Sequence, residues 1–331
     1  MMSSNRRALL AAASTLLTTP SLVRAQPDAA ALYPDRPVRF IVPFPPGQAA
    51  DIFGRLMADE LSKRWPQRVV VENRSGGAGA LGMEAGARAA PDGYTLVVGT
   101  SGTLGVNPSL VPNLPYDAER DFAAVTNIFT LPLVLVAHPG AGLDDLPTVL
   151  DRARERPGAL NYASAGPGTA QHMAMEMLAH RAGVRLTHVP YRGSGPAMAD
   201  LIAGNVPLMM DSLASALPQV QSGRARAVAT TGRARPPQLA STATVAEAGL
   251  TGYEALGWSG LVAPAATPPK IIRRINADAV AILRDPVVAG RMAELGGFAD
   301  PGSPEQFASF IRDEISKWRK VAKEAGVRLE G

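Results

Sequence analysis

Short runs of β-branched and other apolar residues alternate along the chain with longer segments whose apolar residues recur at helical spacing. In residues 51–64, for example, Ile52, Leu56 and Leu61 fall near one face of a helix. Such a βαβαβ order favours parallel strands joined by right-handed crossovers. The first series predicts strands and helices in turn at residues 38–42, 51–64, 68–72, 80–90 and 94–99.

A second series follows an extended segment at residues 123–136. Its strands are expected at residues 133–137, 160–163, 186–189, 206–210 and 225–230. Its helices are expected at residues 170–182 and 196–203. Two further helices are expected toward the end of the chain, at residues 268–283 and 304–325. The alternation predicts an α/β protein with two lobes, each a mostly parallel sheet flanked by helices, and with hinge strands between them. We expect residues 26–126 and 250–331 in lobe 1 and residues 127–249 in lobe 2.

The first 25 residues have the three regions of an export signal peptide. Arg6 and Arg7 precede a short apolar stretch at residues 8–17, and the small residue Ala25 suits cleavage after it. The stretch is shorter than the ~20 residues that span a bilayer. The paired arginines also fit a twin-arginine signal, so the export route stays open. We therefore expect an exported protein. The chain has no Cys, which excludes a lipid anchor at the cleavage site.

Composition narrows the classes of function. Lys and Arg number 33 against 29 Asp and Glu, but three of the arginines lie in the signal, which leaves 33 − 3 = 30 basic residues. The remaining charges are interspersed, so no nucleic acid is expected as a partner. A hydrophobic fraction of 46% and a charged fraction of 19% exclude a disordered chain. The absence of Cys also excludes disulfides, thiolate metal sites and a Cys nucleophile.

The loops that follow the predicted strands are nearly free of charge and rich in Gly, Ser, Thr and Pro. They are found at residues 43–50, 99–105, 164–169 and 191–196, and several lead into helices. Backbone N–H groups at helix starts hold anions without a cationic side chain, and ligands of open α/β sheets bind at these strand ends. A carboxylate or phosphate ligand is the leading interpretation. Ordinary turn chemistry would select the same residue types.

One motif matches a dinucleotide site in spacing but not in context. Residues 77–82 read G-x-G-x-x-G, yet the next strand ends at Gly99 without the acidic residue that would bind a ribose hydroxyl. The match also follows the second predicted strand rather than the first. We interpret it as a helix start packed closely against the sheet, and we expect no cofactor.

Catalytic and metal-binding signatures are weak. Ser101 and Ser164 lie in incomplete versions of the G-x-S-x-G elbow, which leaves an exported α/β hydrolase as an alternative. The four His residues lack a metal-binding spacing, so no metal site is expected, and no catalytic residue is assigned. His172 and Glu176 stand four residues apart, which is most often a surface or capping pair.

An ordered set of short motifs resembles the Bug family of exported receptors, the solute-binding proteins of tripartite tricarboxylate transporters. The set begins with PVRFIVPFPPG at residues 37–47 and Asp51, and continues with VENR at 71–74 and APDGYTL at 90–96. It goes on with LPYD at 114–117, NYASAG at 161–166, HVPYRGSGP at 188–196, TVAEAG at 244–249 and WSGL at 258–261. The motifs cover almost the whole chain after the signal.

The resemblance implies a periplasmic-binding-protein fold of two lobes, related to the type II class, that closes on a small organic acid. Family ligands are mostly carboxylates, gripped largely through backbone amides and ordered water. The implied partners are this acid and the membrane permease subunits of a tripartite transporter, with a monomeric receptor. Carried over to this sequence, the ligand-binding candidates are Pro46, Gly47, Gln48, Asp51, Ser101, Gly102, Thr103, Ser164, Gly168, Thr169, His172, Tyr191, Gly193, Ser194 and Asp211.

Gln48 departs from the family pattern, which has a second Gly at this position. Its amide adds a donor and an acceptor near the expected binding site, so it is expected to reshape the pocket or to select a different distal group. The sequence leaves two alternatives to transport. One is the hydrolase above, and the other is a receptor that reports its ligand to a membrane sensor.

Overall fold

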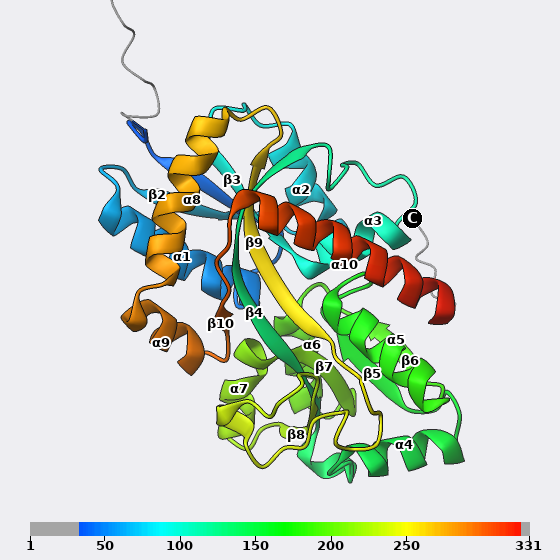
Figure 1. Ribbon diagram of the computed structural model, residues 1–331. Coiled ribbons are helices and arrows are strands. Elements are labelled where there is room, and N and C mark those ends of the chain that lie inside the picture. Colours follow the sequence, from blue (N-terminus) through cyan, green and yellow to red (C-terminus); the bar gives the residue numbers. More distant parts are fainter. Residues whose placement is uncertain (1–32, 326–331) are drawn as a thin grey trace, which may run out of the picture.

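The computed structural model describes residues 33–325 and shows a mixed α/β protein with a curled sheet (Figure 1). The expected signal peptide at residues 1–25 lies outside the described residues. None of the described helices is long and apolar enough to cross a membrane. The sheet has the strand order β2-β1-β3-β9-β4-β7-β5-β6, with β10 and β8 paired to β4 outside this path.

Three parallel strands and two helices open the described part of the chain, as the hydrophobic pattern predicts. β1 lies between β2 and β3, and Val38, Phe40 and Val42 of β1 are fully buried between the flanking layers. We call the elements around this part of the sheet the first lobe. In chain order they are β1 (Val38–Val42), α1 (Ala49–Arg64), β2 (Val69–Asn73), η1 (Gly77–Gly79), α2 (Ala80–Ala87), β3 (Thr95–Thr100), η2 (Ser101–Val106) and α3 (Asn107–Leu110).

The Gly-rich motif at residues 77–82 makes close packing possible. A Cβ at Gly82 would lie 2.7 Å from the Pro43 Cα and from the Arg74 carbonyl oxygen, so only Gly lets α2 approach the loop after β1. Gly79 has a φ of +91°, and a Cβ there would meet Thr103 at 2.6 Å. At Gly82 the motif packs backbone against backbone, and at Gly79 it makes room for the side chain of Thr103.

Two long antiparallel strands connect the halves of the molecule. β4 (Phe122–Ala137) pairs with β9 (Leu256–Pro264) over Phe122–Pro132, and its last five residues pair with β7 instead. The extended segment at residues 123–136 is thus one strand that belongs to both parts of the sheet. Figure 1 shows β4 and β9 running side by side from one half of the molecule to the other.

The elements beyond the crossing form the second lobe. β5 and β6 are parallel to each other, and β5 also pairs in parallel with β7, as the βα order predicts. β7 begins two residues later than predicted, which places Asp211 inside the strand. The elements are η3 (Pro139–Ala141), α4 (Leu146–Glu155), β5 (Asn161–Ser164), α5 (Ala170–Ala182), β6 (Thr187–Pro190), α6 (Ser194–Ile202), β7 (Leu208–Ser212), α7 (Leu213–Gln221), β8 (Arg226–Thr230) and η4 (Pro237–Leu239).

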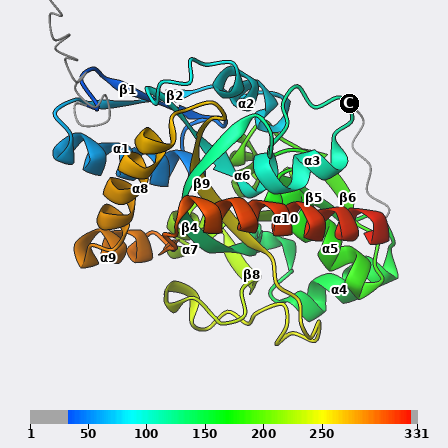
Figure 2. The same cartoon turned by 45° about the horizontal axis from the view of Figure 1, so that its top comes forward.

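The last helix joins the two lobes. α10 lies beside α3 of the first lobe and α5 of the second in both views (Figures 1 and 2). Val106 of η2, Met173 of α5 and Trp318 of α10 are fully buried in one apolar cluster across the lobes. The chain after β9 comprises α8 (Pro269–Leu283), α9 (Pro286–Glu294), β10 (Phe298–Ala299) and α10 (Pro304–Ala325).

Glu314 anchors α10 to the hinge. Its buried carboxylate accepts hydrogen bonds from the indole N–H groups of Trp258 on β9, at 2.8 Å, and Trp318, at 3.0 Å. Lys317 also donates to the second carboxylate oxygen at 2.9 Å. One charged side chain therefore holds two tryptophans in place.

We predict that Glu314→Leu lowers the free energy of unfolding by about 3 kcal/mol, because it leaves two buried indole N–H groups without an acceptor. Urea denaturation followed by circular dichroism measures this loss. Asp313→Leu, an exposed acid beside it on the same helix, is the matched control and should cost less than about 1 kcal/mol. Equal losses in the two variants would contradict this role.

Candidate functional site

A pocket lies between the lobes at the hinge, and we call it the inner pocket. It holds about 440 Å³ of space, which includes its open mouth. None of the residues that line it in the described chain has a charged side chain. The lining includes Phe44, Gln48, Ala49, Ala50, Thr100, Ser101, Gly102, Phe129, Leu131, Leu133, Thr169, Ala170, Gln171, Ser212, Gly257, Trp258 and Ser259.

Helix starts from both lobes line this pocket. The first two residues of α1, of η2 and of α5 all line it, namely Ala49 and Ala50, Ser101 and Gly102, and Ala170 and Gln171. The N–H groups of a first helical turn have no partner inside the helix. They also carry the positive end of the helix dipole. The pocket therefore offers oriented donors to an anion without a basic side chain.

Capping side chains leave these first amides free. The hydroxyl oxygen of Thr169 accepts from the N–H of His172 at 3.3 Å, and that of Thr100 accepts from the N–H of Thr103 at 3.2 Å. Ser212, which also lines the pocket, caps α7 in the same way. Each cap satisfies the third amide of its turn. The first two amides remain available for a ligand.

Gln48 precedes α1 and makes no capping hydrogen bond with its side chain. It is 6% exposed and lines the inner pocket, and its Oε1 has no hydrogen-bond partner among the described residues. A buried amide oxygen without a partner is costly. Gln48 is therefore placed to contact a ligand by its side chain.

Asp51 positions the loop instead of lining the pocket. It accepts hydrogen bonds from the Gly47 N–H at 3.0 Å, from Arg55 at 2.9 Å and from Asn73 at 2.8 Å. Burial alone would raise the pKa of Asp51, but these hydrogen bonds hold it below its ordinary value. Its contribution is to hold the loop before α1 in one conformation.

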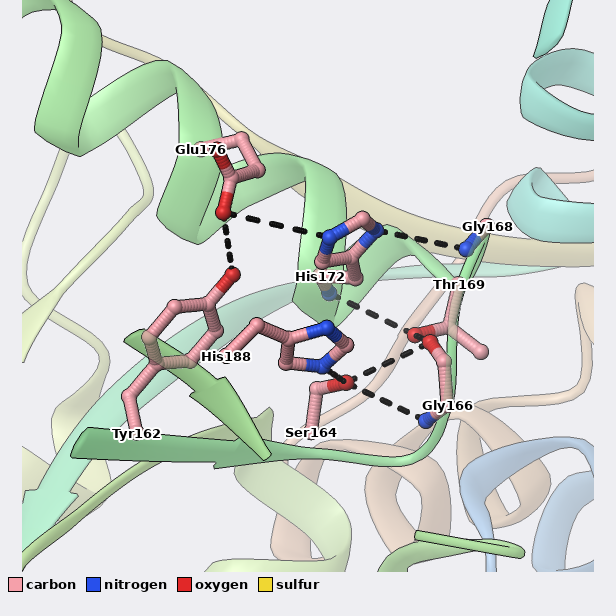
Figure 3. A network of polar contacts seen from close by, with 8 residues as sticks. All are labelled: Tyr162, Ser164, Gly166, Gly168, Thr169, His172, Glu176 and His188. Carbon is pink, nitrogen blue, oxygen red and sulfur yellow. Dashed lines mark hydrogen bonds and ion pairs between the residues drawn. The ribbon is translucent and has the colours of Figure 1, made fainter. Parts of the chain in front are cut away.

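A polar network of the second lobe supports the loop at residues 164–169 (Figure 3). The N–H of Gly168 donates to His172 Nδ1 at 3.3 Å. The imidazole of His172 stacks on that of His188, with 4.2 Å between ring centroids. His188 Nε2 lies 2.7 Å from the hydroxyl of Ser164, which also accepts from the Gly166 N–H. The loop is thereby held from behind by two rings and a hydroxyl.

The same network keeps both imidazoles neutral. Burial lowers the pKa of His172 to about 3, with a smaller contribution from neighbouring His188, and burial lowers the pKa of His188 to about 4. His172 Nδ1 acts as an acceptor toward Gly168, so its proton sits on Nε2, 3.8 Å from Glu176. Neither ring brings positive charge to the pocket at neutral pH.

Asp211 lies beneath the second-lobe loops and is fully buried. Its Oδ1 accepts from the Ser194 hydroxyl at 2.6 Å and from the Ser212 N–H at 2.7 Å. Burial raises its pKa to about 6, although these hydrogen bonds act in the opposite direction. Asp211 thus ties the starts of α6 and α7 together, because it reaches both.

The predicted ligand-binding residues do not all line one pocket. Gln48, Ser101, Gly102 and Thr169 line the inner pocket, whereas Tyr191 and Gly193 line a second and larger space between the lobes, the outer chamber. Gly47, Ser194 and Asp211 border a third cavity. The predicted residues that line none of these three spaces are Pro46, Asp51, Thr103, Ser164, Gly168 and His172.

Several pocket residues carry no distinctive signal in the sequence. Leu131, Leu133 and Trp258 come from the hinge strands and are apolar, so they cannot be told from core residues by type. Ser212 could have been found, because a Ser directly before a helix is a capping signal. Within residues 33–325 no cluster of three or more His, Asp or Glu side chains could hold a metal.

Comparison with known proteins identifies the family. The model of the tripartite tricarboxylate transporter family receptor matches residues 53–327, so the chain belongs to this family. A relative from Pseudomonas sp. (strain P51), the UPF0065 protein in the tcbD-tcbE intergenic region, is 41% identical over 320 residues. The match covers 96% of this chain and 94% of the relative. The resemblance expected from the motifs is confirmed.

Two solved structures show the same architecture. The periplasmic binding protein BugD has a TM-score of 0.85 at 31% identity, over 90% of this chain and 100% of that chain. Rpa4515 of R. palustris, solved with adipate, has a TM-score of 0.87 at 34% identity, over 89% of this chain and 99% of that chain. The expected two-lobed periplasmic-binding-protein fold is confirmed, and members of this family are periplasmic solute-binding receptors.

The neutral state of His172 predicts a dependence of stability on pH. The ordinary pKa of histidine is 6.5, so below this pH His172 is protonated in the unfolded chain but not in the folded chain. The free energy of unfolding therefore falls as the pH drops from about 6.5 toward 3. Between pH 7 and pH 5 the free energy of unfolding falls by about 2 kcal/mol because of this group. His172→Gln should lose about 2 kcal/mol less than wild type over this range.

Urea denaturation at both pH values measures the difference. His180→Gln replaces an exposed histidine of the same helix and should behave like wild type. Identical pH dependence in His172→Gln and wild type would show that the buried ring does not resist protonation.

Proposed function

We propose that this chain is a periplasmic receptor that captures a small organic carboxylate in the inner pocket. The observation that supports this most is the convergence of three helix starts from two lobes on a pocket without charged side chains. Oriented amides in a pocket that excludes most water bind a carboxylate strongly, because each donor is already in place. Adipate in the related Rpa4515 is a ligand of this chemical class.

The lobes touch one another beside the pocket, which supports closure around a ligand. The Ser215 hydroxyl of the second lobe donates to the Gly47 carbonyl of the first at 3.2 Å. A Cβ at Gly102 would lie 3.2 Å from the Gly168 carbonyl oxygen, so these two backbone segments are in near contact. We propose the lobe boundaries at residues 126–127 and 249–250, with β4 and β9 as hinge strands. A ligand that contacts both lobes selects this closed state.

The proposed route and partners follow from the same assignment. Residues 1–25 would direct export and be removed, and the mature receptor would move freely without a lipid anchor. It would act as a monomer and deliver its ligand to the membrane permease subunits of a tripartite transporter. Family membership and the absence of Cys support this proposal.

We further propose that the receptor binds its ligand without converting it. Ser164 and His188 resemble a nucleophile and its base in distance, at 2.7 Å. The Ser164 side chain, however, is fully buried and lines neither the inner pocket nor the outer chamber. A nucleophile must reach its substrate, and this hydroxyl instead supports the loop above it.

Isothermal titration calorimetry of the mature chain with succinate, adipate, citrate and benzoate tests the receptor proposal. At least one of these acids should bind with a dissociation constant in the micromolar range or below, and none should be converted. Folded protein that binds none of the four would overturn the proposal.

Gly102→Leu should weaken carboxylate binding at least tenfold, because the added side chain would separate the lobes at Gly168 while leaving the amide donors intact. The melting temperature of the free protein should stay within a few degrees of wild type. Gly195→Leu adds the same group where nothing lies within 4 Å and serves as the control. Equal affinities in the two variants would show that closure at Gly102 does not matter for binding.

A further inference from the structure

The third cavity lies along two helices of the second lobe and holds about 640 Å³ including its open mouth. α6 lines it with Ser194, Met198 and Ile202, which recur every four residues and so share one face of the helix. α7 lines it with Ser215 and Gln219, which are also four residues apart. The cavity therefore follows the facing sides of both helices.

A buried carboxylate lies at the inner end of the third cavity. Asp211 is fully buried and borders this cavity but neither the inner pocket nor the outer chamber. Its Oδ1 accepts from the Ser194 hydroxyl and the Ser212 N–H, whereas its Oδ2 has no hydrogen-bond partner among the described residues. Gln171 is near enough to lower the pKa of Asp211 but makes no hydrogen bond to Oδ2. A partner for Oδ2 therefore has to enter from the cavity.

This carboxylate also lacks a counter-ion. A pKa of about 6, raised by burial, leaves Asp211 ionised at neutral pH, and none of the described basic side chains forms an ion pair with it. Arg224 borders the same cavity, but its Nε donates to Ser222 at 3.2 Å. It follows the end of α7, whose nine residues span about 13 Å, so it stands at the opposite end from Asp211. A buried charge without a partner is costly.

The unpartnered atoms of the third cavity call for a donor that carries positive charge. Both Asp211 Oδ2 and Gln219 Oε1 are acceptors without a partner among the described residues. A primary ammonium group brings three donors and the charge that an ionised carboxylate pairs with best. Met198 and Ile202 offer apolar contact to an alkyl chain beyond it. Asp211 is the one acidic residue that borders the cavity in the described chain, whereas a hard metal cation needs several oxygen ligands.

We propose that the third cavity is a second binding site of this protein and takes a small primary alkylamine. The ammonium group donates to Asp211 Oδ2, and the alkyl chain lies along Met198 and Ile202. Gly47 of the first lobe also borders the cavity and accepts from Ser215 at 3.2 Å, so a bound amine lies against the contact between the lobes. No residue lines both this cavity and the inner pocket, so the proposal does not depend on the carboxylate receptor.

A titration with n-butylamine at neutral pH, followed by the methyl resonances of ¹³C-labelled methionines, tests this proposal on the mature chain. The amine is protonated at this pH, as a lysine side chain is. It should shift the methyl resonance of Met198 in a saturable way, with a dissociation constant in the millimolar range or below. Butyltrimethylammonium has the charge without a donor, and n-butanol has the chain without the charge, so both should bind at least tenfold more weakly.

Two variants should remove the amine site by different means. Asp211→Asn keeps Oδ1 as an acceptor but replaces the unpartnered oxygen with a donor, so it should weaken n-butylamine at least tenfold. Ala199→Trp adds a large side chain at an exposed position that borders the cavity, and it should weaken the amine without changing a buried group. Asp200→Asn is the matched control, because this acid of α6 does not border the cavity and accepts from Tyr191 and Asn205 instead. It should change the affinity less than twofold.

The absence of a saturable shift in wild type would overturn the proposal. Equal weakening by Asp211→Asn and Asp200→Asn would show only attraction to negative charge and would overturn it as well, as would an unchanged affinity in both Asp211→Asn and Ala199→Trp. Equal binding of n-butylamine and butyltrimethylammonium would exclude a site that needs a donor. Carboxylate titrations of the same wild-type sample report on the inner pocket alone, so failure of the amine site leaves the receptor proposal standing.

Discussion

The antiparallel pairing of β4 with β9 is the constraint on which the rest of the structure depends. Because β4 leaves β9 at Pro132 and continues beside β7, one strand belongs to the sheets of both lobes. Parallel strands on either side then end at the same gap, and the helices that follow them begin there. The pocket is therefore a consequence of sheet topology, and its donors are fixed by hydrogen-bond ladders rather than by flexible side chains.

The buried polar groups around the gap are arranged so that the pocket itself stays neutral. Burial keeps the two imidazoles behind the 164–169 loop uncharged. The carboxylate of Asp51 accepts hydrogen bonds from Gly47, Arg55 and Asn73. Asp211 holds the starts of two helices from below. Each group stabilises a loop by a specific hydrogen bond, and the remaining positive potential comes from helix ends.

Local patterns predicted the extended linker and most strands and helices of the βα series, because period and capping are local properties, but they did not predict α4, α7 and α9. β9 escaped prediction, since Gly257, Ser259 and Gly260 interrupt its apolar pattern. A tertiary contact explains one of them: a Cβ at Gly260 would lie 2.2 Å from the Phe307 ring. A shift of two residues at β7 moved Asp211 from an expected loop into the buried strand. The sequence indicated the amide donors only through the composition of their loops, because every residue except Pro carries the same backbone N–H.

Because the donors are backbone amides, such a receptor can diverge in sequence in a particular way. A point mutation at Ala49, Ser101 or Ala170 alters a side chain but leaves the N–H in place, unless the new residue is Pro. The backbone donors therefore withstand mutation, whereas the side chain of Gln48, which makes no hydrogen bond among the described residues, can change without disturbing them. A family built on this plan can exchange one acid for another by changing walls alone, without rebuilding the charge chemistry of the site.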